Sequence, residues 1–213
     1  RSERKICELY SNAFYNGELI VDEEINKQKQ HKFRFFKSSV VWLDTGNLEN
    51  REDEQKGTGK INRCSVEYIR RTLYKLCEQI KEQNLDYSIG VITPYKAQKE
   101  LLEQEIKPKD FDDFKIDIGT VDSFQGSDRD IIVYDCVRSS KGTRGAKIDF
   151  IADEKRLNVS LSRAKKLLII IGDMEFLFRA GTKENSNPFT DIIKYININK
   201  DKYQIIKLGS KKQ

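Results

Sequence analysis

Two arginines and a serine stand at helical spacing between an acidic residue that can begin a helix and an apolar run. Asp153 precedes Arg156, Ser160 and Arg163, and the apolar run 167–171 follows. In a helix, the two arginines and the serine lie at i, i+4 and i+7 and share one outward face. Guanidinium groups are always charged and meet phosphate oxygens in a planar fork. The spacing therefore predicts a phosphate-binding face, with an ordinary solvated basic face as the other interpretation.

The elements that must position this face alternate between strands and helices. Asn62 can cap a helix whose apolar residues repeat with helical spacing up to Ile80. Several strands are continuous apolar runs, which is typical of a mostly parallel sheet with helices on both faces. Strands are predicted at 40–44, 88–93, 116–121, 131–137, 167–171 and 203–208, and loops at 21–37, 45–60 and 138–150. Helices are predicted at 62–80, 97–106, 153–164 and 189–198, together with a helix-like segment at 1–20 that ends in the turn Tyr15-Asn16-Gly17.

Polar residues follow three of the predicted strands. They are Thr93-Pro94-Tyr95, the run from Asp122 to Gly126, and Gly172-Asp173. Ligands of parallel α/β sheets bind at the carboxyl ends of the strands. We therefore expect the binding residues of this chain to gather at that edge.

Composition narrows the function classes. The 213 residues carry 39 Lys and Arg against 34 Asp and Glu, a net charge of +5 that suits a polyanionic partner. The four cysteines form no C-x-x-C pair and His31 is the single histidine, so no metal site and no histidine base is expected. Free cysteines in apolar stretches favour a reducing, cytoplasmic location. No apolar run approaches the ~20 residues that span a bilayer, so no membrane partner is expected.

One segment imitates a phosphate-binding P-loop. Gly57-Thr58-Gly59-Lys60 ends in Gly-Lys, but the pattern requires a glycine where Glu54 stands and Ser or Thr where Ile61 stands. No apolar strand precedes it. The sequence is therefore predicted to lack a Walker A motif of its own.

Four segments, taken in order, resemble one family. Residues 90–98 read GVITPYKAQ, 119–132 read GTVDSFQGSDRDII, 156–164 read RLNVSLSRA, and the chain opens with RSERKICELYSNAFYNGEL. These resemble the last motifs of superfamily 1 helicases, in the branch of the nonsense-mediated-decay RNA helicase. The resemblance covers residues 1–20 and 38–200. It implies a RecA-like fold of the P-loop-NTPase type, with residues 1–213 as the second motor domain and 1–37 as the entry segment from a first domain.

The resemblance also implies roles for individual residues. Arg163 would be an arginine finger and Arg1 a second phosphate-reaching arginine. ATP with Mg²⁺ would be held mainly by an N-terminal RecA-like domain of the same protein, while this domain contributes Gln125, Gly126, Asp128 and Arg156. Asp128 stands where the family usually has Glu, and Arg156 is equally suited to fixing its helix by pairing with a carboxylate.

Single-stranded DNA or RNA is the second implied partner. Thr93, Pro94, Tyr95 and Gln98 match the family's strand-end motif beside the nucleic-acid track, and Thr120 and Asp122 match the next motif. Hydroxyls, amides and a ring suit sequence-independent gripping of a single strand, although Tyr95 fits a packing role as well. Two alternatives stay open: a degenerate motor kept as a nucleic-acid-binding or docking scaffold, and an unrelated doubly wound binding domain.

Overall fold

The computed structural model describes residues 2–21, 31–112, 114–142, 146–184 and 186–209. Six strands form one sheet in the order β5-β4-β6-β7-β1-β8, and all of its pairings are parallel. The strands are β1 (Val40–Asp44), β4 (Ile89–Thr93), β5 (Ile116–Thr120), β6 (Arg129–Asp135), β7 (Ala164–Gly172) and β8 (Gln204–Lys207). The predicted α/β fold with a parallel sheet is confirmed.

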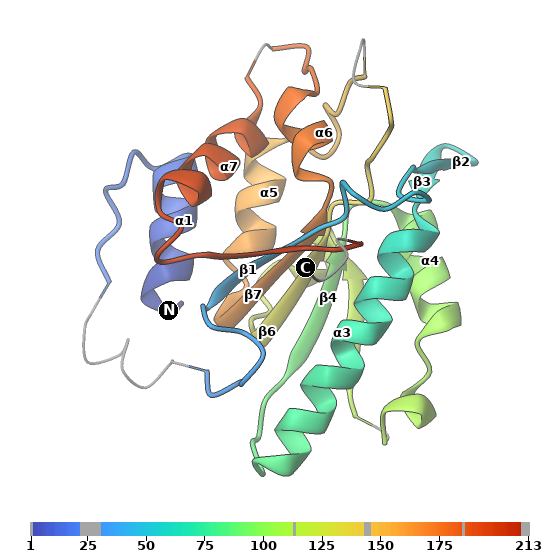
Figure 1. Cartoon of the computed structure of the whole chain (residues 1–213), viewed down its shortest axis with the longest axis vertical. Coiled ribbons are helices and arrows are strands. Elements are labelled where there is room, and N and C mark those ends of the chain that lie inside the picture. Colours follow the sequence, from blue (N-terminus) through green and yellow to red (C-terminus); the bar gives the residue numbers. More distant parts are fainter. Residues whose placement is uncertain (1, 22–30, 113, 143–145, 185, 210–213) are drawn as a thin grey trace.

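Helices cover both faces of this sheet (Figure 1). Alternate strand residues point to opposite faces, so Trp42 packs with one helical layer while Val41 and Leu43 pack with the other. The first layer contains α1 (Arg4–Phe14), η2 (Val121–Phe124), α5 (Glu154–Leu161), α6 (Met174–Arg179) and α7 (Pro188–Ile198). The second layer contains α3 (Arg63–Glu82), α4 (Lys96–Glu105) and η1 (Pro108–Phe111).

Local sequence explains where the main helices begin. The side chain of Asn62 accepts a hydrogen bond from the amide of Ser65 and caps α3, and Asp153 accepts one from the amide of Arg156 and caps α5. Asp173 caps α6 in the same way, a helix that the apolar pattern did not predict. Because α6 is short, only its cap and two buried residues, Phe176 and Leu177, could have signalled it.

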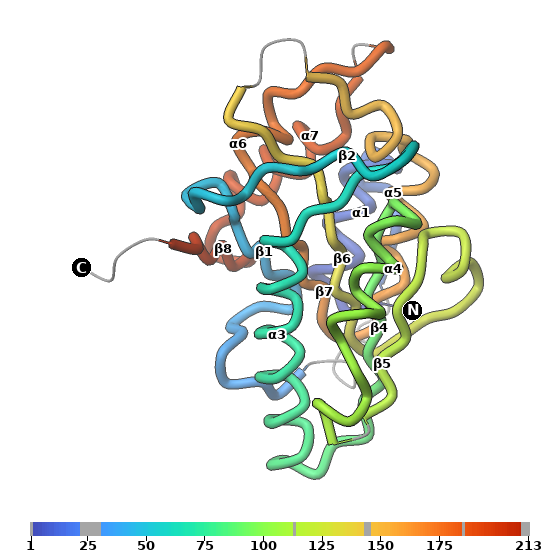
Figure 2. The backbone as a smooth tube through the Cα atoms, turned by 90° about the vertical axis from the view of Figure 1, so that its right-hand side faces the viewer, coloured from blue at the N-terminus to red at the C-terminus, as the bar shows by residue number. Residues whose placement is uncertain are grey.

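The segment predicted as a loop at 45–60 contains a hairpin instead. β2 (Glu54–Lys56) pairs antiparallel with β3 (Gly59–Ile61), and Gly57 turns between them with φ +58°. Lys60 Nζ lies 2.9 Å from Asp53 Oδ1, so this lysine already pairs with a carboxylate. The Gly59-Lys60 pair thus lies in the second strand of a hairpin, not in a phosphate-binding loop between a strand and a helix. Figure 2 shows the hairpin near the start of α4.

Candidate functional site

The carboxyl ends of β4 and β5 meet at one edge of the sheet. Thr93 and Thr120 are register partners in the parallel pairing, and η2 begins directly after Thr120. Asp122 and Gln125 are exposed there. The structure therefore brings together the ends of the two segments that were expected to face a nucleic acid.

The strand-end motif itself is more buried than the sequence suggested. Thr93, Pro94 and Tyr95 are all buried, and the Thr93 hydroxyl makes no hydrogen bond to any residue that the structure describes. Burial raises the pKa of the Tyr95 hydroxyl, while the nearby Arg138 guanidinium opposes that rise. The Tyr95 ring stacks on Phe150 with 5.0 Å between the ring centroids. The side chain of Tyr95 therefore packs inside the protein, as the second interpretation of this residue predicted.

Gln98 lies in the interior, which corrects its expected contact with nucleic acid. Its carbonyl oxygen accepts a hydrogen bond from the Asn62 amide at 2.8 Å, and its amide nitrogen donates to Ser65 Oγ at 3.0 Å and Asp135 Oδ2 at 2.7 Å. The side chain is completely buried. Gln98 therefore joins the starts of α3 and α4 to the end of β6, and it has no surface to offer a ligand.

Asp135 is the charged centre of this buried network. It also accepts hydrogen bonds from Ser65 Oγ at 3.2 Å and from the Val137 amide at 3.0 Å. Burial raises its pKa to about 6, and the three hydrogen bonds oppose that rise. Val137 adopts φ +64°, a region that β-branched residues rarely occupy, and its carbonyl accepts a hydrogen bond from Asn62 Nδ2. The network therefore fixes the path of the chain as it leaves β6.

The turn after η2 presents backbone and an amide side chain to solvent. Gln125 and Gly126 are exposed, and Gly126 has φ +83°, which a residue without a side chain adopts at little cost. Asp128 follows at the entry to β6. The Gln amide can donate and accept, and the glycine lets a ligand approach the backbone closely. This turn keeps the geometry that the sequence predicted for it.

Arg163 differs from its predicted place. α5 ends at Leu161, so Arg163 lies in the turn before β7 and not on the helical face of Arg156. Ser160 is fully buried, and its hydroxyl donates to the Arg156 carbonyl at 2.9 Å. The predicted outward face of Arg156, Ser160 and Arg163 is therefore wrong, because the core of this layer takes the serine and the helix stops one turn early.

The guanidinium of Arg163 is held by a carboxylate. Its Nη1 lies 3.1 Å from Asp128 Oδ1, and its Nε donates to the Val159 carbonyl at 3.1 Å. The side chains of Arg163 and Asp128 are 11% and 18% exposed. Both residues belong to motifs that the sequence singled out, and the structure brings them into direct contact at the amino ends of β6 and β7.

Arg156 connects this region to the strand ends. Its Nη2 lies 2.8 Å from Asp122 Oδ2, which supports the interpretation that Arg156 pairs with a carboxylate. Its guanidinium also lies over the Phe150 ring, 4.8 Å from the centroid. Phe150, 47% exposed, thus contacts both Arg156 and Tyr95. No sequence pattern predicted a role for Phe150, because an aromatic residue in a basic loop shows no pattern by itself.

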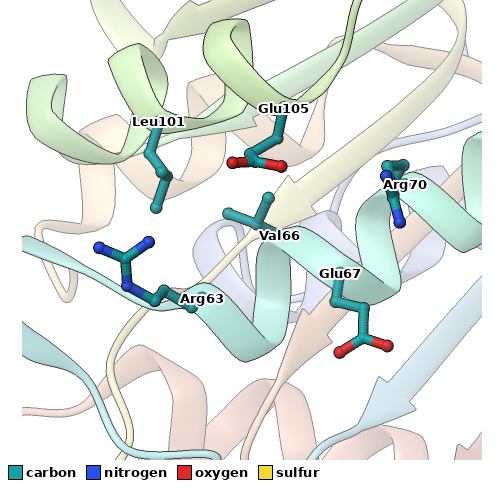
Figure 3. A pocket seen from close by; sticks show the side chains of 6 residues that line it. All are labelled: Arg63, Val66, Glu67, Arg70, Leu101 and Glu105. Carbon is teal, nitrogen blue, oxygen red and sulfur yellow. The ribbon is translucent and has the colours of Figure 1, made fainter. Parts of the chain in front are cut away.

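Two cavities lie beside α4, and only one of them is lined by residues of the predicted site. A cavity of about 700 Å³ lies between the hairpin and the start of α4, and its lining includes Lys56, Lys96 and Phe150. A smaller one of about 240 Å³ lies between α3 and α4, lined by Arg63, Val66, Glu67, Arg70, Leu101 and Glu105 (Figure 3). Only the first adjoins residues of the predicted site.

Three further predictions concern Arg1, a metal site and a membrane-spanning helix. Arg1 lies outside the described residues. No group of three His, Cys, Asp or Glu side chains comes together as a metal site within the described ranges. None of the helices in those ranges combines the length and apolarity needed to cross a bilayer.

The fold and these residues define a RecA-like α/β domain that carries motor-protein motifs without a P-loop. Residues 1–175 match the family described as AAA domain. The chain is 31% identical over 202 residues to DNA polymerase alpha-associated DNA helicase A of Saccharomyces cerevisiae, covering 86% of this chain and 28% of that protein. It is 40% identical over 180 residues to helicase sen1 of Schizosaccharomyces pombe, covering 83% of this chain and 10% of that protein.

A solved structure has the same fold. The C-terminal domain of a possible DNA helicase from Lactobacillus plantarum WCFS1 aligns with a TM-score of 0.51 at 12% identity, covering 96% of this chain and 97% of that one. The chain belongs to the AAA-domain family, and its sequence relatives are superfamily 1 helicases. It spans less than a third of the length of either yeast relative.

Proposed function

We propose that this chain is the second motor domain of an ATP-dependent superfamily 1 helicase or translocase that acts on single-stranded DNA or RNA. The observation that carries this proposal is the meeting of Arg163 with Asp128, beside the exposed Gln125-Gly126 turn. Two separate segments with helicase motifs, residues 119–132 and 156–164, supply these residues to one surface. The family relationship supports the same conclusion.

Nucleotide binding is proposed to be shared with a first RecA-like domain. The described residues include donors suited to phosphate oxygens, but the Gly-Lys segment is a hairpin turn and cannot cradle a triphosphate. A bound ATP with Mg²⁺ would supply the phosphoryl group whose charge the arginines meet. Arg1, outside the described residues, is proposed as the second of these arginines.

Arg163 is proposed to exchange its carboxylate partner for phosphate oxygens when the two domains close. Asp128 keeps the guanidinium compensated while no phosphate is near, so the cation is never left buried and unpaired. A guanidinium brought to a transferring phosphoryl group is worth ~10³–10⁵ in rate. Asp128 is thereby a holding residue for the finger, and Arg156 holds η2 through Asp122.

Single-strand contact is proposed at the edge formed by β4 and β5. Thr120 is partly exposed and Asp122 and Lys96 are exposed, and the cavity beside the hairpin is lined by Lys56, Lys60 and Lys96. Because Gln98 and Tyr95 are internal, they position this surface instead of touching the strand. Phosphate contact predicts an affinity that falls as salt rises.

Arg163→Ala in the full-length protein tests the proposal, with Lys155→Ala as the matched control. Lys155 is exposed on α5, so its removal deletes the same charge without touching Asp128. We expect Arg163→Ala to lower ATP turnover by roughly a thousandfold and to leave single-strand affinity within a few-fold. Lys155→Ala should retain both. Unchanged turnover in Arg163→Ala would defeat the finger role.

A second candidate function is a nucleic-acid-binding scaffold derived from a motor. The burial of Arg163 against Asp128 favours it, because the pair also serves as an ordinary structural ion pair. Under this alternative, the full-length protein shows no nucleic-acid-stimulated ATP turnover, and Arg163→Ala lowers only thermal stability. The same pair of variants therefore separates the two functions.

A further inference from the structure

The strand β8 forms an open edge of the sheet on the side away from β4 and β5. It pairs only with β1 among the described strands, and Figure 2 shows it outside β1. The amide of Leu208 donates to the Asp44 carbonyl, so the alternate residues Ile205 and Lys207 direct their backbone groups away from β1. These groups are available to another strand.

Hollows flank this edge on both faces of the sheet. On the α3 side a cavity of about 580 Å³ is lined by Ile206 and Leu208 together with aromatic residues, Phe35, Phe36, Tyr68 and Tyr74. On the α6 and α7 side a cavity of about 860 Å³ is lined by Ile205 and Tyr203. Successive residues of a strand point to opposite faces. A strand added beside β8 would therefore place its side chains alternately in the two cavities.

The charges around the second cavity indicate the chemistry of the occupant. Lys37, Lys200 and Lys207 line it and are exposed, and none forms an ion pair with any residue in the described ranges. The acidic residues of the same lining are occupied: Glu175 pairs with Arg179, and Asp44 accepts hydrogen bonds from the amides of Gly46 and Met174. No carboxylate among the described residues thus compensates the three lysines of this cavity.

Edge lysines are also a common protection against unwanted strand pairing. Protection of an edge requires no cavities beside it. The partly exposed aromatic side chains Phe35 and Tyr74 on the other face would instead favour binding of another apolar segment. The combination of a free edge, an apolar hollow and unpaired lysines fits an incomplete binding groove better than a protected edge.

We propose that β8 binds an extended acidic segment of a partner protein, which adds to the sheet as a further strand. The apolar residues of the segment occupy the hollow between Phe35 and Tyr74, and its intervening carboxylates face Lys37, Lys200 and Lys207. Backbone hydrogen bonds to Ile205 and Lys207 fix its position, as in other strand-addition complexes. The surface is distinct from the proposed motor site and does not depend on it.

A synthetic peptide of about nine residues that alternates Ile and Glu tests this proposal by fluorescence anisotropy. We expect micromolar binding to the full chain, at least tenfold weaker binding of the Ile/Lys peptide of the same length, and a similar loss when the amides on one edge of the Ile/Glu peptide are N-methylated. The N-methylated probe leaves the protein unaltered, so its result is independent of protein folding.

Two substitutions of Lys207 distinguish the contribution of its backbone N–H to peptide binding from that of its side-chain charge. Lys207→Gln removes the charge, while Lys207→Pro also removes the outward N–H, a change that edge strands tolerate. We expect several-fold weaker binding for the first and a further loss of about tenfold for the second, whereas Lys109→Gln on η1 binds like the wild type. Equal binding of the Ile/Glu and Ile/Lys peptides would overturn the proposal. So would self-association of the chain that Lys207→Pro abolishes, or displacement of the peptide by a single-stranded oligonucleotide.

Discussion

Replacing Asp135 by Asn should make the stability of this domain respond differently to pH. Asp135 is completely buried, and its pKa is raised to about 6 from an ordinary value of 3.8. Because the folded pKa lies above the unfolded one, the neutral form favours the fold. The resulting stabilisation is complete below about pH 4 and is lost as the pH rises through 6.

The size of the effect follows from the two pKa values. Between pH 5 and pH 7.5, the wild type should lose about 1.4 kcal/mol of unfolding free energy through this one group. The Asn side chain does not titrate, so whatever its hydrogen bonds to Gln98 and Val137 cost is the same at both pH values. The difference in unfolding free energy, wild type minus Asp135→Asn, therefore falls by that amount as the pH rises.

Urea unfolding at the two pH values measures this difference, with Asp110→Asn as the control. Asp110 is exposed in η1, so its replacement should give a difference that stays nearly constant with pH. A constant difference for Asp135→Asn as well would show that the carboxylate is ionised in the fold at both pH values. A difference that grows with pH would refute the reasoning about burial.

Two other substitutions test the packing beside the site. Gly119→Ala would place a Cβ 2.2 Å from Ser123 Oγ and 2.8 Å from the Phe124 ring, so we expect a loss of about 1–3 kcal/mol of unfolding free energy in urea. Gly142→Ala, in open space, should change little; equal urea midpoints for the two variants would show that η2 adjusts to the added methyl group. Phe150 contacts both Tyr95, beside the proposed strand edge, and Arg156, beside the proposed nucleotide site, so we expect it to couple the two sites. Phe150→Leu in the full-length protein should therefore lower the stimulation of ATP turnover by a single strand by roughly tenfold with basal turnover retained, whereas Phe178→Leu should leave the stimulation intact. Normal stimulation in Phe150→Leu would refute this coupling role.

The sequence was sufficient for the strands because their apolar runs are continuous. Val40–Asp44 and Ile89–Thr93 are buried along their whole length, and such runs fit only the interior of a covered sheet. The hairpin at Glu54–Ile61 was missed because its strands are short and mostly polar. What holds it is tertiary: Asp53 pairs with both Lys60 and Arg138, partners that no local pattern reveals.

The sequence predicted which segments come together at the candidate site, but it placed the side chains of Ser160 and Gln98 on the surface although both are buried. Helical spacing predicted Ser160 on the same outward face as Arg156, but Ser160 packs in the core. Arg163 was misplaced because periodicity does not show where a helix ends. Gln98 looked like a ligand contact because a polar residue after a strand end is normally exposed. Its burial depends on Asp135, which lies 37 residues later in the chain.

The left-handed backbone at Val137 has a mechanical consequence. The next two residues, Arg138 and Ser139, both bind Asp53. Arg138 Nε lies 3.0 Å from its carboxylate, to which the Ser139 amide also donates at 3.0 Å, and the Asp53 amide donates to the Ser139 carbonyl at 2.9 Å. The Asp53 carboxylate thereby joins the start of the loop after β6 to the segment that leads into the hairpin. A ligand that displaces the hairpin must therefore either break the contacts of Asp53 with Arg138 and Ser139 or move the start of this loop together with the hairpin.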